Sequence, residues 1–528
     1  MKSIGSVKVT AIFAVMLFTG CGGSSSSSSN NLQTFEPSDA RFSAPHDTAV
    51  ETDTQITVDA QLQAVISKHR LTGDPSLGRT LPNIQEPLPQ LGKLLFFSKS
   101  LSGEMDSACV SCHHPALAGT DKLSLPVGVK AINVDLLGPG RTHREGSPKV
   151  PRNAPTIFNV AMHDVNLFWD ARIASLSGLV GENGAGANGI RTPDSAFGVR
   201  DEFAGVNLVA AQAAFPVTSA HEMRGDSFEQ GNANQEVRDH LAARIGGYGI
   251  GANELAANSW LAEFQQAFAS TQTAEELITY ANIAQALGEY QRSMVFINNP
   301  WSRYVKGDSA AMSADQKAGA VLFYTPTSQG GAGCASCHAG DNFTDERQHL
   351  AAFPQIGQGK GDVNNDDFGA ERESKQANER YRFKTPSLLN VALTAPYGHA
   401  GSYETLEQVI DHYEDPYTAV KNYFAAGGWC QLQQFAALQN CQALYPNAQA
   451  NTDLALTILQ QQRQANTTQF RNMDLTEAQH LQLIAFMHAL TDDCAAARNC
   501  VAPWIADTTN NGPDGQQLNA LDKNGNPL

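Results

Sequence analysis

Two short motifs of the form Cys-x-x-Cys-His constrain this chain more than any other feature of its sequence. They occupy residues 109–113 and 334–338. Two cysteines three positions apart lie on one face of a helical turn, so both thiols can reach the two vinyl groups of one haem. The histidine that follows then ligates the iron. The predicted attachment residues are Cys109, Cys112, Cys334 and Cys337, and the predicted iron ligands are His113 and His338.

A redox-active Cys-x-x-Cys pair and half of a zinc site share this cysteine spacing. Zinc would need further paired cysteine or histidine ligands nearby. A thioredoxin-like site needs no following histidine and is not expected twice. Two complete motifs therefore favour two covalently bound haem c groups.

The N-terminus is typical of an exported lipoprotein. Lys2 and Lys8 precede an apolar run at 9–18, which is too short to span a bilayer comfortably. We predict a lipoprotein signal peptide at residues 1–21, lipid on Cys21, and a flexible Ser/Asn-rich tether at 22–57. An ordinary signal peptide with an incidental cysteine is the alternative. The predicted location is the periplasm, lipid-anchored to the outer membrane, with membrane contact only through the lipid on Cys21.

The remaining composition narrows the partners and the compartment. The net charge of −17 argues against nucleic acid as a partner. Four cysteines lie outside the haem motifs and the lipid site. Their proximity in sequence suggests Cys430–Cys441 and Cys494–Cys500 disulfides, which suit an oxidising compartment, although other pairings remain open.

The periodicity of apolar residues predicts a mainly α fold of two cytochrome c-like haem domains with long loops. Helical spacing appears at 60–69, 273–294 and 476–490, and no strand alternation is sustained. Gly- and Asn-rich stretches at 178–189 and 357–369 predict loops. The predicted layout is an N-terminal, peroxidatic haem domain at 58–299, a C-terminal, electron-transfer haem domain at 300–500 and a tail at 501–528.

Further motifs, in a fixed order around the haem motifs, make the chain similar to the bacterial di-haem cytochrome c peroxidase family, which includes MauG. The similarity covers roughly residues 91–490. The motifs are Leu91-Gly-Lys-Leu-Leu-Phe-Phe97, Arg152-Asn-Ala-Pro-Thr156, Phe168-Trp-Asp-Ala-Arg172, the segment from Gln212 to Glu222, Thr385-Pro386-Ser387 and Leu393-Thr-Ala-Pro-Tyr-Gly-His399.

The resemblance implies a catalytic pocket at the first haem. Family peroxidases often carry a second histidine ligand sixteen residues after the proximal one, but here that position is Val129, which leaves His143 as a residue that could approach the iron. Peroxide can bind only to an iron that has a vacant coordination position. Glu222 aligns with the family's catalytic glutamate and Gln212 with its pocket glutamine, and Pro216 lies between them at the matching spacing. Without the family, Glu222 would be read as a surface carboxylate.

The resemblance also implies an electron path and a distinctive second haem. Trp169 aligns with the tryptophan between the haems, although a core role explains it equally well. Tyr413 aligns with the distal ligand, which is methionine in the peroxidases and tyrosine in MauG-type members. His412 is the nearest competing ligand. A phenolate stabilises oxidised iron, so Tyr413 is expected to lower the potential of this haem.

Family members hold a calcium ion between the domains. The matching positions are the side chain of Asn153 and the main-chain carbonyls of Thr394 and Pro396, and oxygen donors of this kind suit calcium. One departure is Leu389, where the family often has an arginine.

The expected function is reduction of hydrogen peroxide at a five-coordinate N-terminal haem. The electrons would come from a small periplasmic donor, a cytochrome c or a cupredoxin, through the C-terminal haem. Three alternatives remain: MauG-like oxidation of a partner protein's side chains, a non-catalytic di-haem electron carrier, and oxygen-dependent cleavage of a hydrophobic polymer.

Overall fold

The computed structural model describes residues 48–252 and 254–528. The predicted signal peptide, Cys21 and residues 22–47 of the predicted tether lie outside these residues. The first helix, α1 (Thr48–His69), begins earlier than the apolar pattern indicated, so residues 48–57 are helical rather than a flexible tether. In the part of the chain that is described, no helix is both long and apolar enough to cross a bilayer.

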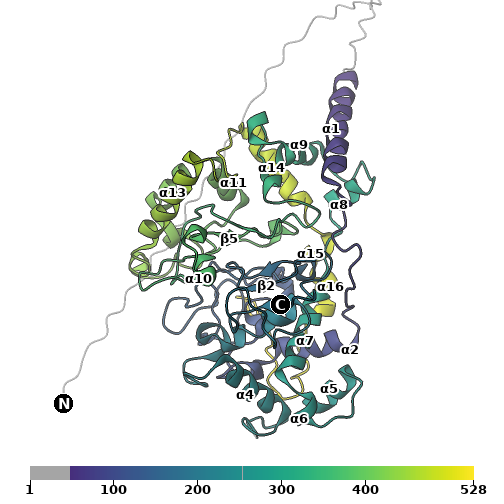
Figure 1. Cartoon of the computed structure of the whole chain (residues 1–528), viewed down its shortest axis with the longest axis vertical. Coiled ribbons are helices and arrows are strands. Elements are labelled where there is room, and N and C mark those ends of the chain that lie inside the picture. The colour runs from purple at the N-terminus through teal and green to yellow at the C-terminus, as the bar shows by residue number, and fades with distance from the viewer. Residues whose placement is uncertain (1–47, 253) are drawn as a thin grey trace, which may run out of the picture. The chain divides into compact units, whose positions relative to one another are not determined.

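Residues 52–528 pack as one unit, and its secondary structure confirms the predicted mainly α class. Figure 1 shows α9, α11 and α14 grouped at one end of this unit and α4, α5 and α6 at the other. The N-terminal half contains α2 (Pro87–Phe97), α3 (Leu208–Ala213), α4 (Asn234–Gly246), α5 (Trp260–Ala267), α6 (Ala274–Leu277) and α7 (Tyr280–Arg292).

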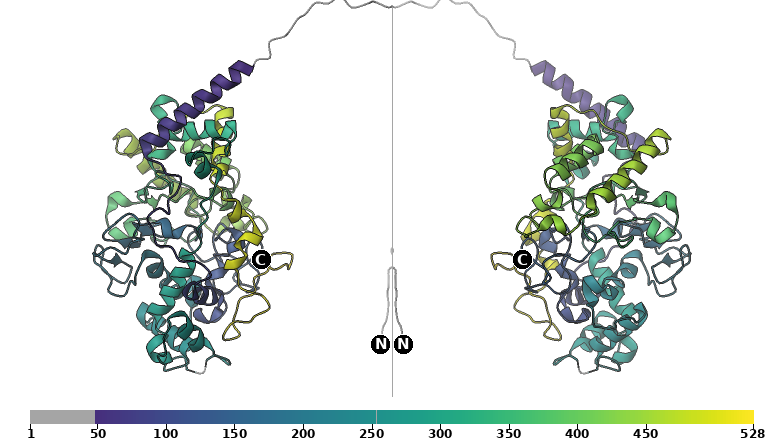
Figure 2. Two further views of the ribbon diagram at one scale, coloured as in Figure 1. Left: turned by 90° about the vertical axis from the view of Figure 1, so that its right-hand side faces the viewer. Right: turned by 90° about the vertical axis from the view of Figure 1, so that its left-hand side faces the viewer.

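The C-terminal half carries most of the remaining helices. They are α8 (Pro300–Val305), α9 (Ala314–Tyr324), α10 (Glu371–Ser374), α11 (Leu406–Glu414), α12 (Pro416–Ala425), α13 (Ala448–Gln464), α14 (Glu477–Ala489), α15 (Asp493–Ala496) and α16 (Arg498–Val501). In the side views of Figure 2 the green helices of residues 400–465 again lie apart from the teal helices of residues 230–295.

Each half is built around one tightly crossed helix pair, α2 with α7 and α9 with α14. A glycine sits at each crossing. A Cβ at Gly92 would lie 2.0 Å from the Ala286 carbonyl oxygen, and one at Gly319 would lie 1.9 Å from the Gln482 carbonyl oxygen. Only glycine permits backbones to approach this closely. The Gly92 of the first sequence motif is thus explained by packing.

The predicted helix at 273–294 is two helices, α6 and α7, with a break at residues 278–279. The Thr279 side chain accepts a hydrogen bond from the Asn282 amide at 3.3 Å and thereby caps α7. Apolar periodicity continues across the break because both pieces bury the same face. The predicted helix at 476–490 is confirmed as α14, and the predicted loops at 178–189 and 357–369 contain neither helix nor strand.

The strands are short and serve to fix corners rather than to form a layer. The strands β1 (Asn166–Leu167), β2 (Ile173–Ser175) and β3 (Ile190–Arg191) form an antiparallel sheet in that order, with Leu167 opposite Ile173. The second pair, β4 (Gln348–His349) and β5 (Phe383–Lys384), is also antiparallel. The first sheet holds the corner that carries Trp169.

Both ends of the described chain pack against the half that is distant in sequence. The first hydrophobic core, formed mainly by residues 84–296, also includes Ala495, Val501, Ile505, Ala506, Leu518 and Ala520 from the C-terminal end. The second core, formed mainly by residues 301–490, includes Leu62 of α1 and Leu71, which follows α1. The tail is therefore part of the N-terminal half, and α1 is part of the C-terminal half.

A buried carboxylate fixes the tail in place. Asp514 accepts hydrogen bonds from Trp260 Nε1 and Ser100 Oγ, both at 2.7 Å. The two suggested disulfides, Cys430–Cys441 and Cys494–Cys500, are both formed.

Candidate functional site

Both Cys-x-x-Cys-His motifs open onto one cavity of about 800 Å³. Residues from the two halves of the chain line it, so the two motifs share a single interior space. The cavity wall is largely apolar, with a few polar groups that converge on it, as is usual for cofactor sites.

The first motif presents its ligand atoms to this cavity. Residues 109–111 form a single 3-10 turn, η2 (Cys109–Ser111), and the Cys109 and Cys112 thiols are unbonded. The His113 Nδ1 lies 3.2 Å from the Gly119 carbonyl oxygen. A carbonyl only accepts, so Nδ1 carries the proton and Nε2 keeps its lone pair for a metal. Burial raises the pKa of the Cys109 thiol to about 12, so it stays protonated.

The second motif repeats this geometry. Its turn, η8 (Cys334–Ser336), leaves the Cys334 and Cys337 thiols unbonded. The His338 Nδ1 lies 3.1 Å from the Phe343 carbonyl oxygen, which again leaves Nε2 free. Paired thiols beside an imidazole with a fixed tautomer, at both ends of one apolar cavity, fit two haem c groups.

Three residues expected in a peroxide pocket line the cavity on the side of the first motif. Gln212 comes from α3, Pro216 opens the 3-10 turn η5 (Pro216–Thr218), and Glu222 lies in a π-helical turn, η6 (Ala220–Arg224). Isolated π-helical turns occur frequently at functional sites because they redirect a side chain. The structure therefore brings Gln212, Pro216 and Glu222 into one wall with His113.

The positions considered for a second ligand of the first iron do not line this cavity. Val129 is 3% exposed and outside the lining. His143 is also outside the lining, and its Nδ1 accepts a hydrogen bond from the Glu145 amide at 3.1 Å. The His114 Nδ1 accepts a hydrogen bond from the Ala116 amide. Among the described residues, the histidines that line the cavity are His113, His163, His338, His349 and His399.

Gly128, which the sequence did not single out, supports the glutamate. A Cβ at this position would lie 2.3 Å from the Glu222 carbonyl oxygen and 2.5 Å from that of His221. The chain just before Val129 thus packs directly on the backbone of the π-helical turn. The absence of a side chain there sets how deeply Glu222 reaches the cavity.

We expect Gly128→Ala to displace the Glu222 turn, because the clash is with backbone atoms that cannot rotate away. Overpacking of this kind costs about 1–3 kcal/mol. The expected result is a lower thermal unfolding midpoint together with a lower kcat for peroxide turnover, measured on haem-loaded protein. A variant with unchanged kcat would contradict the supporting role of this contact.

Trp169 lies where the two halves meet. Its Nε1 donates to the Asn153 carbonyl oxygen at 2.9 Å, and its own carbonyl accepts from the Lys384 amide at 2.8 Å. Its indole also lines the cavity that both motifs share.

The second motif faces Tyr413, which lies in α11 and lines the cavity. Burial raises the pKa of Tyr413, and the neighbouring Cys337 and Cys334 sulfur groups raise it further. The competing residue, His412, points elsewhere. Its Nε2 lies 2.8 Å from the Ala351 carbonyl oxygen and its Nδ1 lies 3.0 Å from Tyr403 Oη, so neither nitrogen is free.

The three residues that carry the candidate calcium ligands, Asn153, Thr394 and Pro396, all line the cavity. Asn153 Nδ2 donates to the Leu123 carbonyl at 2.9 Å, which leaves the amide oxygen as the available donor atom. Lys122 Nζ contacts the carbonyl of Leu393, the residue before Thr394. Leu389 is buried in the second core and also lines the cavity, so an apolar side chain stands where the family's arginine would be.

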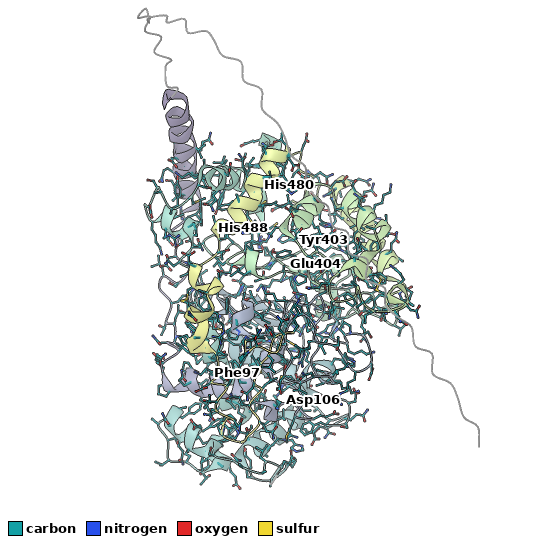
Figure 3. The ribbon with its side chains drawn as sticks, turned by 180° about the vertical axis from the view of Figure 1, so that it is seen from behind. Phe97, Asp106, Tyr403, Glu404, His480 and His488 are labelled. Atoms are coloured by element: carbon teal, nitrogen blue, oxygen red, sulfur yellow. A yellow bond between two sulfur atoms is a disulfide. The ribbon has the colours of Figure 1, made fainter. Side chains whose placement is uncertain are left out.

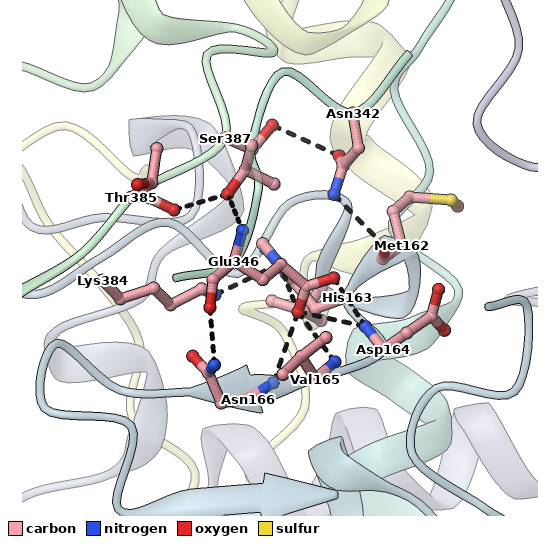
Figure 4. A network of polar contacts seen from close by, with 12 residues as sticks. Met162, His163, Asp164, Val165, Asn166, Asn342, Glu346, Lys384, Thr385 and Ser387 are labelled. Carbon is pink, nitrogen blue, oxygen red and sulfur yellow. Dashed lines mark hydrogen bonds and ion pairs between the residues drawn. The ribbon is translucent and has the colours of Figure 1, made fainter. Parts of the chain in front are cut away.

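Sequence reasoning missed a buried polar network between the halves, shown in Figure 4. The Glu346 carboxylate accepts hydrogen bonds from the amides of Asp164 and Val165, both at 2.9 Å, and lies 3.6 Å from His163 Nδ1. Lys384 Nζ lies 3.1 Å from His163 Nδ1. Although burial raises the pKa of Glu346, the hydrogen bond and charge of His163 lower it to about 2. No sequence motif marks this contact.

A second missed network centres on Arg152. Its guanidinium binds Asp170 at 2.6 Å and Asp367 at 2.6 Å, and all three side chains are at most 5% exposed. Arg152 and Asp170 stand in two of the quoted motifs, but Asp367 comes from the C-terminal half. The ion pairs therefore join the Trp169 corner to that half.

Comparison with known proteins gives one family and a consistent set of relatives. Residues 86–310 match the family described as di-haem cytochrome c peroxidase. The methylamine utilization protein MauG of Methylorubrum extorquens is 29% identical over 61% of this chain and 67% of its own length. The cytochrome c551 peroxidase of Pseudomonas aeruginosa is 27% identical over 62% of this chain and 71% of its own length.

Among solved structures, the diheme peroxidase BthA from Burkholderia thailandensis aligns with 84% of this chain and 92% of its own length. The sequence identity is 20% and the TM-score is 0.47.

Proposed function

We propose that the chain reduces hydrogen peroxide in the part of the cavity between His113 and Glu222, because residues 86–310 match the di-haem cytochrome c peroxidase family and the relatives reported above are MauG and a cytochrome c peroxidase. These matches confirm the family resemblance and the assignment as a peroxidase-type oxidoreductase, and the family implies haem c. The roles of individual residues are part of the proposal. The observation that carries it is that Gln212, Pro216 and Glu222 share one cavity wall with His113.

The first haem, attached at Cys109 and Cys112, would supply an iron centre that accepts oxidising equivalents from peroxide. The Glu222 carboxylate takes the proton from one peroxide oxygen and delivers it to the other, which makes water a good leaving group. The Gln212 amide donates a hydrogen bond that orients the peroxide. The apolar wall around these groups excludes bulk water.

Electrons would arrive from the side of the second motif. His338 and Tyr413 would hold the iron of the second haem, and Trp169 would relay charge between the two motifs. This layout assigns the peroxidatic role to the N-terminal haem domain (58–299) and electron transfer to the C-terminal one (300–500). The donor would be a small cytochrome c or cupredoxin of the periplasm, with this chain held at the outer membrane by a lipid on Cys21.

We expect Tyr413→Met to raise the midpoint potential of the second haem. A thioether favours reduced iron and a phenolate favours oxidised iron, so the shift should be on the order of 0.1 V, within the ~0.8 V that axial ligands span. Spectroelectrochemical titration measures it. Tyr417→Phe serves as the control, since the Tyr417 hydroxyl donates to the Leu456 carbonyl at 3.1 Å instead. An unchanged potential in Tyr413→Met would mean that Tyr413 is not the ligand.

Calcium would bind at the Asn153 side chain and the carbonyls of Thr394 and Pro396. Hard oxygen donors suit this ion, which must tolerate the neighbouring Lys122 ammonium. Elemental analysis of the purified protein is expected to find a single calcium ion per chain, and Asn153→Leu should lose it. Retention of calcium in that variant would place the ion elsewhere.

A second candidate function is MauG-like oxidation of side chains on a partner protein. Tyr413 and Val129 favour it, because both depart from the peroxidase pattern toward the MauG type. Turnover with reduced cytochrome c distinguishes the two functions: rapid peroxide-dependent oxidation of the cytochrome supports the peroxidase, and peroxide-dependent modification of a co-expressed partner supports the second.

The spectrum of the purified ferric protein tests whether the chain is catalytic at all. We expect a mixture of high-spin and low-spin haem that changes when peroxide is added. A wholly low-spin spectrum that peroxide leaves unchanged would instead indicate a di-haem electron carrier.

A further inference from the structure

A buried tyrosine and a buried histidine form a hydrogen-bonded pair beside the second haem pocket. Tyr403 Oη lies 3.0 Å from His412 Nδ1, and the two side chains are 3% and 0% exposed. Figure 3 labels Tyr403 in the half of the molecule that carries α11 and α14, away from Phe97. Neither residue has a part in the proposed peroxide chemistry.

The second hydrogen bond of His412 fixes the direction of the first. His412 Nε2 lies 2.8 Å from the Ala351 carbonyl oxygen, which can only accept, so Nε2 carries a hydrogen. In a neutral imidazole the other nitrogen then holds a lone pair. The Tyr403 hydroxyl therefore donates to His412 Nδ1, and a base stands in line with the phenolic proton.

One aromatic ring separates this pair from the cavity. Phe353 lines the cavity, and its ring centroid is 5.6 Å from that of Tyr403 and 4.3 Å from that of His412. The same Phe353 ring lies 5.8 Å from Tyr413, the proposed iron ligand. One phenyl ring thus lies between Tyr403 and the proposed iron ligand Tyr413.

A neighbouring tyrosine shows what the histidine adds. The Tyr423 ring is 5.7 Å from that of Tyr403, in an edge-to-face arrangement. The Tyr423 hydroxyl is buried and has no hydrogen-bond partner among the described residues. If Tyr423 lost an electron, its phenolic proton would have no acceptor within hydrogen-bond distance among the described residues, and the positive charge would stay on the phenol itself. Tyr403 can lose an electron and a proton together.

We propose that Tyr403, with His412 as its proton acceptor, is a redox-active site that stores an oxidising equivalent from the second haem. One electron passes from Tyr403 to the cofactor at His338 after that cofactor has been oxidised by peroxide, and the cofactor is reduced by one electron. The Tyr403 O–H bond breaks and an N–H bond forms at His412 Nδ1. The products are a neutral phenoxyl radical and an imidazolium. A later reductant returns the electron, and the proton moves back.

The inference rests on the proposed function, because peroxide is the oxidant. The experiment therefore also uses a second oxidant that does not require the peroxidase reaction. Haem-loaded full-length protein is mixed with equimolar hydrogen peroxide, or is oxidised by photogenerated tris(bipyridyl)ruthenium(III), and is then frozen for electron paramagnetic resonance. Ring-deuterated tyrosine identifies a tyrosyl signal. We expect the signal in the wild type, its loss to baseline in Tyr403→Phe, and its retention in Tyr423→Phe, with haem spectra unchanged in both variants.

The possible outcomes distinguish the redox role of the Tyr403–His412 pair from the proposed peroxidase function. A tyrosyl signal that persists in Tyr403→Phe, or that is missing from the wild type with both oxidants, overturns the redox role of the pair. A signal that appears with the ruthenium oxidant in protein whose haems do not respond to peroxide supports the pair and overturns the proposed peroxidase function.

Discussion

Glu222→Gln is expected to lower kcat for peroxide reduction by about 10²–10⁴-fold, the usual contribution of a positioned general acid–base group. The amide keeps the size and the hydrogen bonds of the carboxylate but cannot accept and return a proton. The haem content should not change, because Glu222 supplies neither an attachment thiol nor an iron ligand in the proposed layout. Steady-state turnover with reduced cytochrome c measures the effect.

The matched control is Glu182→Gln, an exposed carboxylate in the loop at 178–189. It should leave kcat unchanged. If Glu222→Gln retained wild-type kcat while binding both haems, the proton-transfer role would pass to another group in the cavity, and the alignment with the family's glutamate would be wrong.

Arg152→Met is expected to be the most destabilising single substitution among those considered. The Arg152 guanidinium pairs with two buried carboxylates, and its loss would leave Asp367 without its ion-pair partner and Asp170 with Arg172 alone. Breaking one buried ion pair by removing a partner costs about 3–5 kcal/mol, and here two pairs share one arginine. Urea unfolding of the haem-loaded protein should show a large decrease in the midpoint.

The same network gives the stability a defined pH dependence. Burial raises the pKa of Asp170 and of Asp367, but the Arg152 charge outweighs it, and both pKa values lie below the ordinary range. Their stabilisation is thus complete above the unfolded-state pKa of about 3.9 and is lost as the pH falls below it. In the wild type the free energy of unfolding therefore falls at low pH. This fall should be absent from Arg152→Met.

Arg200→Met is the control for the ion pairs. Arg200 pairs with Glu202 on the surface, with 53% and 66% of the side chains exposed, so we expect no measurable change in the urea midpoint. A similar small effect for Arg152→Met would show that the halves are not held together through this arginine.

Some features of the site depend on short-range chemistry and could be predicted. The cysteine spacing, the following histidine and the two disulfides involve residues close in sequence, so local geometry limits their partners. Gln212, Pro216 and Glu222 were found only because a family pattern fixes their order. The loop-rich segments at 178–189 and 357–369 follow from glycine and asparagine, which favour turns wherever they occur.

Other features depend on contacts between distant segments and left no local signal. Gly128 matters because the backbone of Glu222 passes next to it, and Glu346 matters because three consecutive amides of the other half point at it. His412 was a plausible iron ligand in sequence, but its hydrogen bonds to Tyr403 and Ala351 direct both nitrogens away. The tail at 501–528 has no assigned role in the sequence analysis, yet Asp514 fixes it to the N-terminal core.

The sequence by itself determined the two haem-attachment motifs and the mainly helical secondary structure, because cysteine spacing and helical periodicity are properties of neighbouring residues. Only the tertiary structure decided which groups face the shared cavity, which half each chain end joins, and which buried tyrosine has a base within reach. Those outcomes depend on backbone approach and on the direction of single hydrogen bonds between segments hundreds of residues apart, and no local pattern encodes them.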